Sequence, residues 1–224
     1  MPHYAADAVL FDLDGTLLDT IADLADGVNG MLAELGRPVR PLEEIHSFVG
    51  KGIANLVRRS LTENAHASEA EIDAALPVFR RHYARVNGRN TTIYPGVRET
   101  LDTLRAQGRR LAVVTNKSTA FTDPLLAHMG LSGFFEAVVS GDTLPTRKPD
   151  PEMVVHACAL LDVEPARALM IGDSINDSLA ARAAGVPVLL VRYGYSEGGV
   201  PVDAIDCDGL LSNALETLDH LQPR

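Results

Sequence analysis

The stretch Ala8-Val9-Leu10-Phe11-Asp12-Leu13-Asp14-Gly15 decides the fold of this chain. Its four apolar residues in a row predict a short buried strand, and the turn with two aspartates and a glycine ends that strand. Two carboxylates therefore stand where a buried strand stops. In open parallel sheets, binding and catalytic sites form at this edge.

After about residue 90, the chain alternates between apolar strands and helices. The expected strands are Leu111–Thr115, Ala137–Ser140, Ala168–Ile171 and Val186–Val191, with a weak strand near Ala204–Cys207. The expected helices are Val97–Gln107, Phe121–Met129, Pro151–Leu161, Ile175–Ala184 and Leu210–Leu221. This alternation predicts an α/β fold, a Rossmann-like parallel sheet with helices on both faces.

Between the first strand and this α/β part lies a helical stretch without a good strand. Apolar residues recur at spacings of three and four from about Thr20 to Gly36, and further helices are expected at Gly52–Leu61 and about Ser68–Val86. We therefore expect a helical cap domain at 17–89, inserted into an α/β core of residues 1–16 and 90–224. The alternative is that these helices pack directly on the core.

The composition narrows the class of protein. The chain has 224 residues, of which 46% are hydrophobic and 22% charged, as in soluble globular proteins. No apolar run reaches the ~18 residues of a membrane helix, and a net charge of −10 disfavours nucleic-acid binding. Two cysteines, Cys158 and Cys207, are too few to stabilise a secreted domain of this size by disulfide bonds, so we expect a cytoplasmic protein. The oligomeric state stays open.

Polar residues follow four of the expected strands. They are Asp12 and Asp14, then Thr115 and Asn116, then Lys148, and then Asp173. Because parallel strands end at the same edge of a sheet, these side chains are expected to converge. A single aspartate in a turn carries no such signal, since aspartate favours turns and helix starts in any case.

The carboxylates at this edge would repel one another unless a cation offset their charge. Asp173 and Asp177 are four residues apart and share a face on a first helical turn. Two carboxylates about 4 Å apart repel by roughly 4 kcal/mol at an effective dielectric constant of 20. Oxygen ligands without a cluster of His or Cys suit a hard cation such as Mg²⁺ better than Zn²⁺.

These residues resemble the motifs of the haloacid dehalogenase-like hydrolase superfamily. The matching blocks occur in order: Asp12-Leu13-Asp14-Gly15-Thr16-Leu17-Leu18-Asp19, Val113-Val114-Thr115-Asn116-Lys117, Lys148-Pro149-Asp150-Pro151 and Gly172-Asp173-Ser174-Ile175-Asn176-Asp177. The match spans about residues 7–191. The dehalogenases themselves lack a carboxylate at the position of Asp14, so the resemblance favours phosphoryl transfer.

The resemblance implies a role for each matched residue. Asp12 would be the nucleophile, and Asp14 the general acid and then the general base. The Mg²⁺ ligands would be Asp12, Asp173 and the backbone carbonyl of Asp14. Asp177 would be an outer carboxylate that fixes Lys148 or a metal-bound water. Thr115, Asn116 and Lys148 would hold the transferring phosphoryl group.

Within the superfamily, the chain is most similar to the bacterial phosphoglycolate phosphatases. The supporting stretches are Phe48–Gly52, Tyr94–Val97 and Gly141–Pro145. This implies hydrolysis of 2-phosphoglycolate to glycolate and phosphate through an aspartyl phosphate. We expect a cap cation to meet the carboxylate of the substrate, with Lys51 as the first candidate and Arg58 or Arg59 next.

Three alternatives remain open at this point. The first is a phosphatase of another small metabolite or of pyrophosphate. The second is a phosphotransferase similar to β-phosphoglucomutase, which needs an aspartyl phosphate shielded from water. The third is a non-catalytic regulator on the same fold, and the presence of both Asp12 and Asp14 argues against it.

Overall fold

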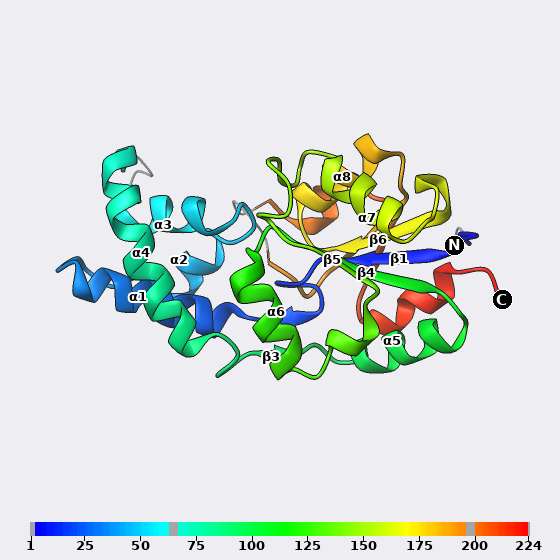
Figure 1. Ribbon diagram of the computed structural model, residues 1–224, viewed down its shortest axis with the longest axis horizontal. Coiled ribbons are helices and arrows are strands. Elements are labelled where there is room, and N and C mark those ends of the chain that lie inside the picture. The colour runs from blue at the N-terminus through cyan, green and yellow to red at the C-terminus, as the bar shows by residue number, and fades with distance from the viewer. Residues whose placement is uncertain (1–2, 63–66, 196–199, 224) are drawn as a thin grey trace.

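A parallel sheet forms the centre of the α/β part of the molecule (Figure 1). The computed structural model describes residues 3–62, 67–195 and 200–223. The strand order is β5-β4-β1-β6-β7-β8, and the strands are β1 Ala8–Phe11, β4 Arg110–Val114, β5 Ala137–Val139, β6 Ala168–Gly172, β7 Val188–Val191 and β8 Gly209–Leu211. Leu10 of β1 is level with Ala112 of β4 and Met170 of β6, so β1 lies between two neighbours.

Alternate residues of β1 face two different layers of helices. Val9 and Phe11 share an apolar cluster with residues of α5 (Val97–Ala106), α6 (Thr119–His128) and the 3₁₀ helix η5 (Ala214–His220). Ala8 and Leu10 belong to a second cluster with α7 (Glu152–Leu160) and α8 (Ile175–Ala184). Because both faces are covered, the strand is a continuous apolar run. This arrangement confirms the predicted fold class.

A group of helices lies at the end of the molecule opposite the chain termini (Figure 1). They are α1 Ile21–Glu34, α2 Leu42–His46, α3 Ile53–Leu61 and α4 Glu69–Val86. Their buried side chains, such as Val28, Leu56 and Phe79, form an apolar cluster that is separate from the two clusters of the sheet. We call these helices the cap. The boundaries of the cap at residues 17–89 stay a prediction.

The chain passes between the core and the cap twice, and the two connecting segments pair with each other. β2 (Leu18–Asp19) and β3 (Thr92–Ile93) form an antiparallel ladder. The expectation that residues 17–89 contain no strand is therefore wrong at β2. A strand of two residues is too short to show a periodic pattern.

The last part of the chain differs from the sequence prediction. The strand expected at Ala204–Cys207 lies instead at β8, and the helix expected over Leu210–Leu221 is the shorter η5. The buried residues of η5 are Ala214, Thr217 and His220. Their spacing of three matches the three residues per turn of a 3₁₀ helix.

Two observations bear on the environment of the chain. Cys158 is buried and Cys207 half-buried, and both are free thiols. Within the described ranges, none of the helices combines the length and the apolar sequence that a membrane crossing requires.

Candidate active site

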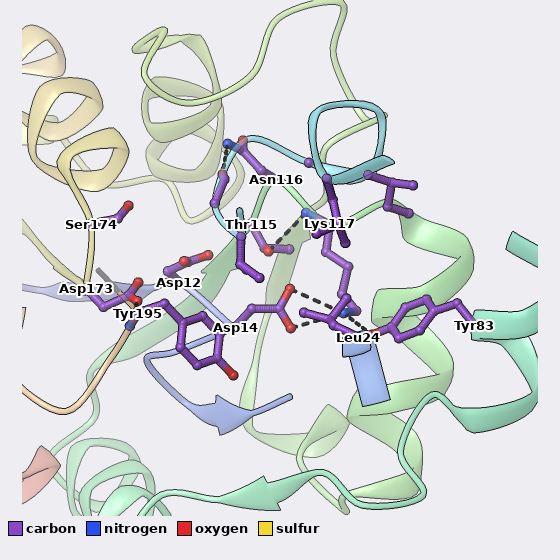
Figure 2. Close-up of a pocket in the computed structure, with 15 residues that line it drawn as sticks. Asp12, Asp14, Leu24, Tyr83, Thr115, Asn116, Lys117, Asp173, Ser174 and Tyr195 are labelled. Atoms are coloured by element: carbon purple, nitrogen blue, oxygen red, sulfur yellow. Dashed lines mark hydrogen bonds and ion pairs between the residues drawn. The ribbon is translucent and has the colours of Figure 1, made fainter. Parts of the chain in front are cut away.

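The polar residues at the strand ends surround one cavity (Figure 2). Its volume is about 590 Å³, including its open mouth. The core contributes Asp12, Asp14, Thr115, Asn116, Lys117, Asp173, Ser174 and Tyr195, and the cap contributes Leu24, Val49, Gly50, Gly52, Ile53, Leu56 and Tyr83. The wall from the sheet edge is therefore polar, and the wall from the cap is mostly apolar.

Lys148 joins Asp12 to Asp177. Its Nζ lies 2.8 Å from Asp12 Oδ1 and 2.6 Å from Asp177 Oδ1, and it donates a hydrogen bond of 2.6 Å to the carbonyl of Val114. All three charged side chains are buried. The ammonium group therefore balances two carboxylates where solvent does not screen their repulsion.

The turn between β6 and α8 is held by Asp177. Its Oδ2 accepts hydrogen bonds from the Ser174 hydroxyl at 2.8 Å, from the Ser174 N–H at 3.1 Å and from the Asp173 N–H at 3.3 Å. These bonds fix the backbone from which the Asp173 side chain projects. Asp177 thus contacts both Lys148 and the segment that carries Asp173.

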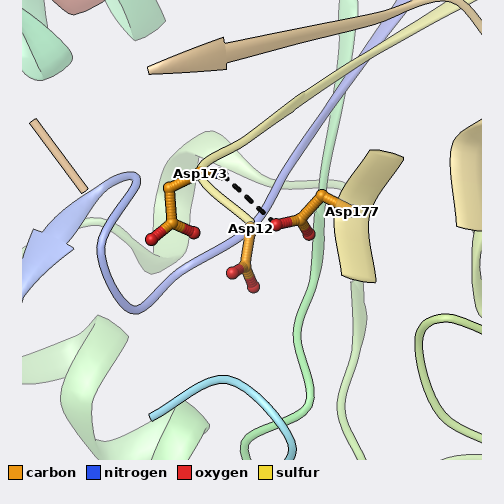
Figure 3. A group of neighbouring side chains, drawn as sticks. All are labelled: Asp12, Asp173 and Asp177. Atoms are coloured by element: carbon orange, nitrogen blue, oxygen red, sulfur yellow. Dashed lines mark hydrogen bonds between the residues drawn. The ribbon is translucent and has the colours of Figure 1, made fainter. Parts of the chain in front are cut away.

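Three carboxylates are close enough to bind one cation (Figure 3). Oxygens of Asp12, Asp173 and Asp177 all lie within 4.8 Å of one another. Asp12 Oδ1 is buried and accepts no hydrogen bond within the geometric limits, and its ion pair with Lys148 Nζ at 2.8 Å leaves it available to a cation. Gly15 packs against Asp173 at a φ of +88°, where a Cβ would clash with the carboxylate. A donor set made only of buried carboxylate oxygens fits a hard cation such as Mg²⁺.

Burial shifts the pKa of two of these carboxyl groups. Desolvation raises the pKa of Asp12 to about 7, against the opposing effect of the Lys148 charge. Desolvation also raises the pKa of Asp173, and the charges of Asp177 and Asp12 raise it further. A bound cation would favour the ionised form of both groups.

The carboxylate of Asp14 is held by residues that the sequence analysis did not assign to the site. Lys117 Nζ lies 3.0 and 3.2 Å from its two oxygens and donates a hydrogen bond of 2.6 Å to the hydroxyl of Tyr83 on α4. The Thr20 hydroxyl donates to Asp14 Oδ1 at 2.7 Å. Figure 2 shows the side chains of Asp14 and Lys117 pointing toward each other.

Lys117 remains charged in this buried position. Burial alone lowers the pKa of its ammonium group, but the charge of Asp14 and the contact with Tyr83 raise it above its ordinary value. The run Thr115-Asn116-Lys117 offered a local signal for this lysine, since it directly follows two candidate residues. Tyr83 had none, because its place depends on how the cap packs on the core.

Thr115 and Asn116 follow β4 and line the cavity. Asn116 Nδ2 donates to the carbonyls of Gly50 and Lys148, each at 2.9 Å, and Asn116 Oδ1 accepts from the Lys148 N–H at 3.0 Å. The Asn116 amide group therefore links the cap loop to the Lys148 segment. The Thr115 hydroxyl accepts a hydrogen bond of 3.2 Å from the Lys117 N–H.

The candidate cap cations lie off the cavity wall. Lys51 is exposed, although Gly50 and Gly52 on either side of it line the cavity. Arg58 forms an ion pair of 2.7 Å with Glu69. Arg59 donates to a backbone carbonyl at 2.6 Å, and its guanidinium lies over an aromatic ring of the cap.

The chain after β7 also reaches the site. The Tyr195 N–H donates to Asp173 Oδ2 at 2.6 Å, and the Tyr195 hydroxyl accepts from the Thr20 N–H at 2.6 Å. This segment starts the glycine-rich stretch Gly194–Gly199, of which residues 196–199 lie outside the described residues.

Comparison with known proteins gives relatives that cover most of the chain. The family model for haloacid dehalogenase-like hydrolases matches residues 9–191. A phosphoglycolate phosphatase of Nitrosospira multiformis is 50% identical over 218 residues, which is 96% of this chain and 95% of the relative. A plasmid-encoded phosphoglycolate phosphatase of Cupriavidus necator is 49% identical over 96% of this chain and 92% of its own length.

A solved structure agrees with the fold. A protein of Haemophilus somnus, described as a predicted phosphoglycolate phosphatase, superposes with a TM-score of 0.89 at 30% sequence identity. The match covers 96% of this chain and 97% of the other. The likeness therefore includes both the sheet and the cap.

Proposed function

The chain belongs to the haloacid dehalogenase-like hydrolase family and is a phosphoric monoester hydrolase, and we propose that its substrate is 2-phosphoglycolate. The products would be glycolate and inorganic phosphate. The observation that carries the chemistry is the buried carboxylate of Asp12 at the end of β1, which lines the cavity, pairs with Lys148 at 2.8 Å and lies beside the carboxylate of Asp173.

In the first step, an Asp12 carboxylate oxygen attacks the phosphorus atom. The bond between phosphorus and the ester oxygen breaks, and the phosphoryl group is transferred to Asp12 as an acyl phosphate. The leaving glycolate alkoxide takes a proton from the carboxyl group of Asp14. Asp14 is two residues from Asp12 and lines the same cavity, which supports this pairing of roles.

In the second step, water attacks the phosphorus of the acyl phosphate. Asp14 accepts the proton of that water, and the bond between phosphorus and the Asp12 oxygen breaks. Inorganic phosphate leaves, and both aspartates return to their starting forms. Asp14 must leave its contact with Lys117 during this cycle, since both of its carboxylate oxygens lie against the ammonium group in the structure and neither is free to reach the leaving oxygen.

Mg²⁺ would be held by Asp12, Asp173 and the backbone carbonyl of Asp14, and when bound it would neutralise charge on the phosphoryl group. Asp177 would keep Lys148 directed at Asp12, which its 2.6 Å contact with Lys148 supports. Thr115, Asn116 and Lys148 would hold the oxygens of the transferring phosphoryl group. Since the side-chain amide of Asn116 already bonds to Gly50 and Lys148, its contribution would come from its backbone N–H.

The names of the relatives support the choice of substrate, because they are about 50% identical to nearly the whole chain. The apolar cap wall also suits a small substrate that the cap covers and shields from water. A cation near the cap would meet the carboxylate of 2-phosphoglycolate, and Lys51 remains one candidate.

The test is phosphate release from 2-phosphoglycolate, with and without Mg²⁺, beside a panel of sugar phosphates and pyrophosphate. We expect Mg²⁺-dependent selectivity for 2-phosphoglycolate and its loss in Asp12→Asn. Selectivity for another member of the panel would overturn the substrate and keep the chemistry. If a sugar phosphate is converted to its isomer without phosphate release, the proposed hydrolysis is wrong and the reaction is a phosphotransfer.

A further inference from the structure

Lys117 is the one basic residue on the described wall of the cavity. Of the 20 lysines and arginines in the chain, only Lys51, Lys117 and Lys148 are lysines. Lys148 is enclosed by two carboxylates and a backbone carbonyl, each within 2.8 Å of its Nζ. Lys51 is exposed. The charge that a substrate meets inside the cavity is therefore that of Lys117.

The surroundings of Lys117 are built to hold an ammonium group out of water. Only 5% of the residue is exposed, and its Nζ lies 4.8 Å from the centre of the fully buried Tyr83 ring. That ring is stacked on Phe79 and packed against Phe121. A buried cation of this kind needs an anionic partner at every stage, because an unpaired one is costly.

In the structure, that partner is Asp14. The ammonium group contacts both of its carboxylate oxygens, so the pair occupies the space between the cap and the sheet edge. The proposed function requires Asp14 to leave this contact. Asp14 would keep the hydrogen bond from Thr20, whereas Lys117 would lose its only carboxylate among the described residues.

We propose that Lys117 binds the carboxylate of the substrate, which takes the place of Asp14 beside its ammonium group. Exchange of one carboxylate for another leaves the local charge unchanged, so the buried cation is never unpaired. A substrate without a second anionic group cannot make this exchange, and Asp14 then stays paired with Lys117. The inference rests on the proposed function and names the residue that recognises the non-reacting end of the substrate.

This arrangement couples recognition to catalysis. The carboxylate adds binding energy and also releases the residue proposed as the acid. Ethyl phosphate has a methyl group in place of the carboxylate of 2-phosphoglycolate. We therefore expect the two substrates to differ in kcat as well as in KM. A cation at the cavity mouth would act on KM alone.

The test compares kcat/KM for 2-phosphoglycolate and ethyl phosphate in the Mg²⁺-loaded wild type, Lys117→Met, Lys117→Arg and Lys51→Met. We expect the ratio of the two kcat/KM values to fall about 100-fold in Lys117→Met, the usual size of a lost charge-assisted hydrogen bond to a buried partner. Lys117→Arg keeps the charge and should keep most of the ratio. Lys117→Gln replaces the methionine variant if that variant does not fold.

Equal losses on both substrates in a folded Lys117 variant would overturn the inference, since they would make Lys117 a purely structural residue. If the ratio of the two kcat/KM values falls in Lys51→Met and not in Lys117→Met, the inference is wrong, and Lys51 of the cap recognises the substrate carboxylate instead. In both cases the wild type still hydrolyses 2-phosphoglycolate. A wild type that prefers another phosphate ester would instead overturn the proposed function, and the inference with it.

Discussion

At the scale of single residues, the charge on Asp12 depends on what is bound beside it. Burial raises the pKa of this group from 3.8 to about 7, and the charge of Lys148 opposes the shift without cancelling it. Between these two pH values, the folded protein without metal binds a proton that the unfolded chain releases. The free energy of unfolding of the metal-free protein should therefore fall as pH rises from about 4 to about 7.

Urea denaturation at pH 5 and pH 7.5, with EDTA and with Mg²⁺, measures this fall. Mg²⁺ should reduce it, because a cation beside the carboxylate favours its ionised form. Asp12→Asn removes one of the two carboxyl groups with a raised pKa and serves as the control, and its free energy of unfolding should depend less on pH than that of the wild type. An identical pH dependence in the wild type and in Asp12→Asn would contradict the raised pKa.

Asp177 offers a prediction about metal affinity. Its contacts with Lys148 and with the backbone of Ser174 and Asp173 position the candidate ligands, and loss of such support commonly costs 10- to 100-fold in affinity. We expect Asp177→Asn to raise the half-saturating Mg²⁺ concentration for phosphate release by roughly that factor. Asp206→Asn, which removes a carboxylate that pairs with Arg182 on the surface, is the matched control. Equal Mg²⁺ requirements in both variants would argue against a supporting role.

At the scale of elements, one buried carboxylate links the first cap helix to the segment that leads back to the core. Asp23 of α1 is fully buried and accepts hydrogen bonds from the N–H groups of Gly88, Asn90 and Thr91 and from the Thr91 hydroxyl. Asp23→Ala leaves these donors without their acceptor, and we expect the free energy of unfolding to fall by about 3 kcal/mol. Urea denaturation measures this loss.

Asp26→Ala is the control for Asp23→Ala. Asp26 lies one turn further along α1, is exposed, and accepts one hydrogen bond of 3.3 Å from the side chain of Asn90. Its loss should change stability by less than about 0.5 kcal/mol. Similar values for the two variants would mean that the segment 88–91 does not depend on Asp23.

The elements that were predictable from sequence are those with long or repeated patterns. The bounds of α8 agree with the expected helix Ile175–Ala184, because its helical start and the glycine that ends it are both local signals. β8 was misplaced, since it is three residues long and pairs only with β7. Short apolar runs do not separate strand from helix.

The site follows the same rule. The convergence of Asp12, Asp14, Thr115 and Asp173 follows from the parallel sheet, because Asp12, Thr115 and Asp173 come directly after strands and Asp14 lies in the turn that follows Asp12. The contact of Lys117 with Tyr83 could not be predicted in this way. It depends on the angle at which α4 packs over the sheet edge, and no local pattern encodes that angle.

At the scale of the whole molecule, net charge opposes the capture of substrate. The chain carries −10 at pH 7, and 2-phosphoglycolate is itself an anion with charge on both ends. Inside the cavity, Mg²⁺, Lys117 and Lys148 would offset the carboxylates, but that balance is confined to a few ångströms. At longer range the substrate meets a negative field, which salt screens over a Debye length of about 10 Å at 0.1 M.

We therefore expect kcat/KM for 2-phosphoglycolate to rise as NaCl is increased from about 10 to about 100 mM at saturating Mg²⁺, by roughly twofold. Ethyl phosphate carries one negative charge fewer, so its kcat/KM should rise less with salt. The difference between the two salt dependences of kcat/KM separates the long-range repulsion of the substrate from specific effects of the salt. A fall in kcat/KM with salt would mean that attraction to the cavity outweighs the repulsion by the surface. In that case the local cations, with Lys117 among them, would govern the approach of the substrate as well as its final position.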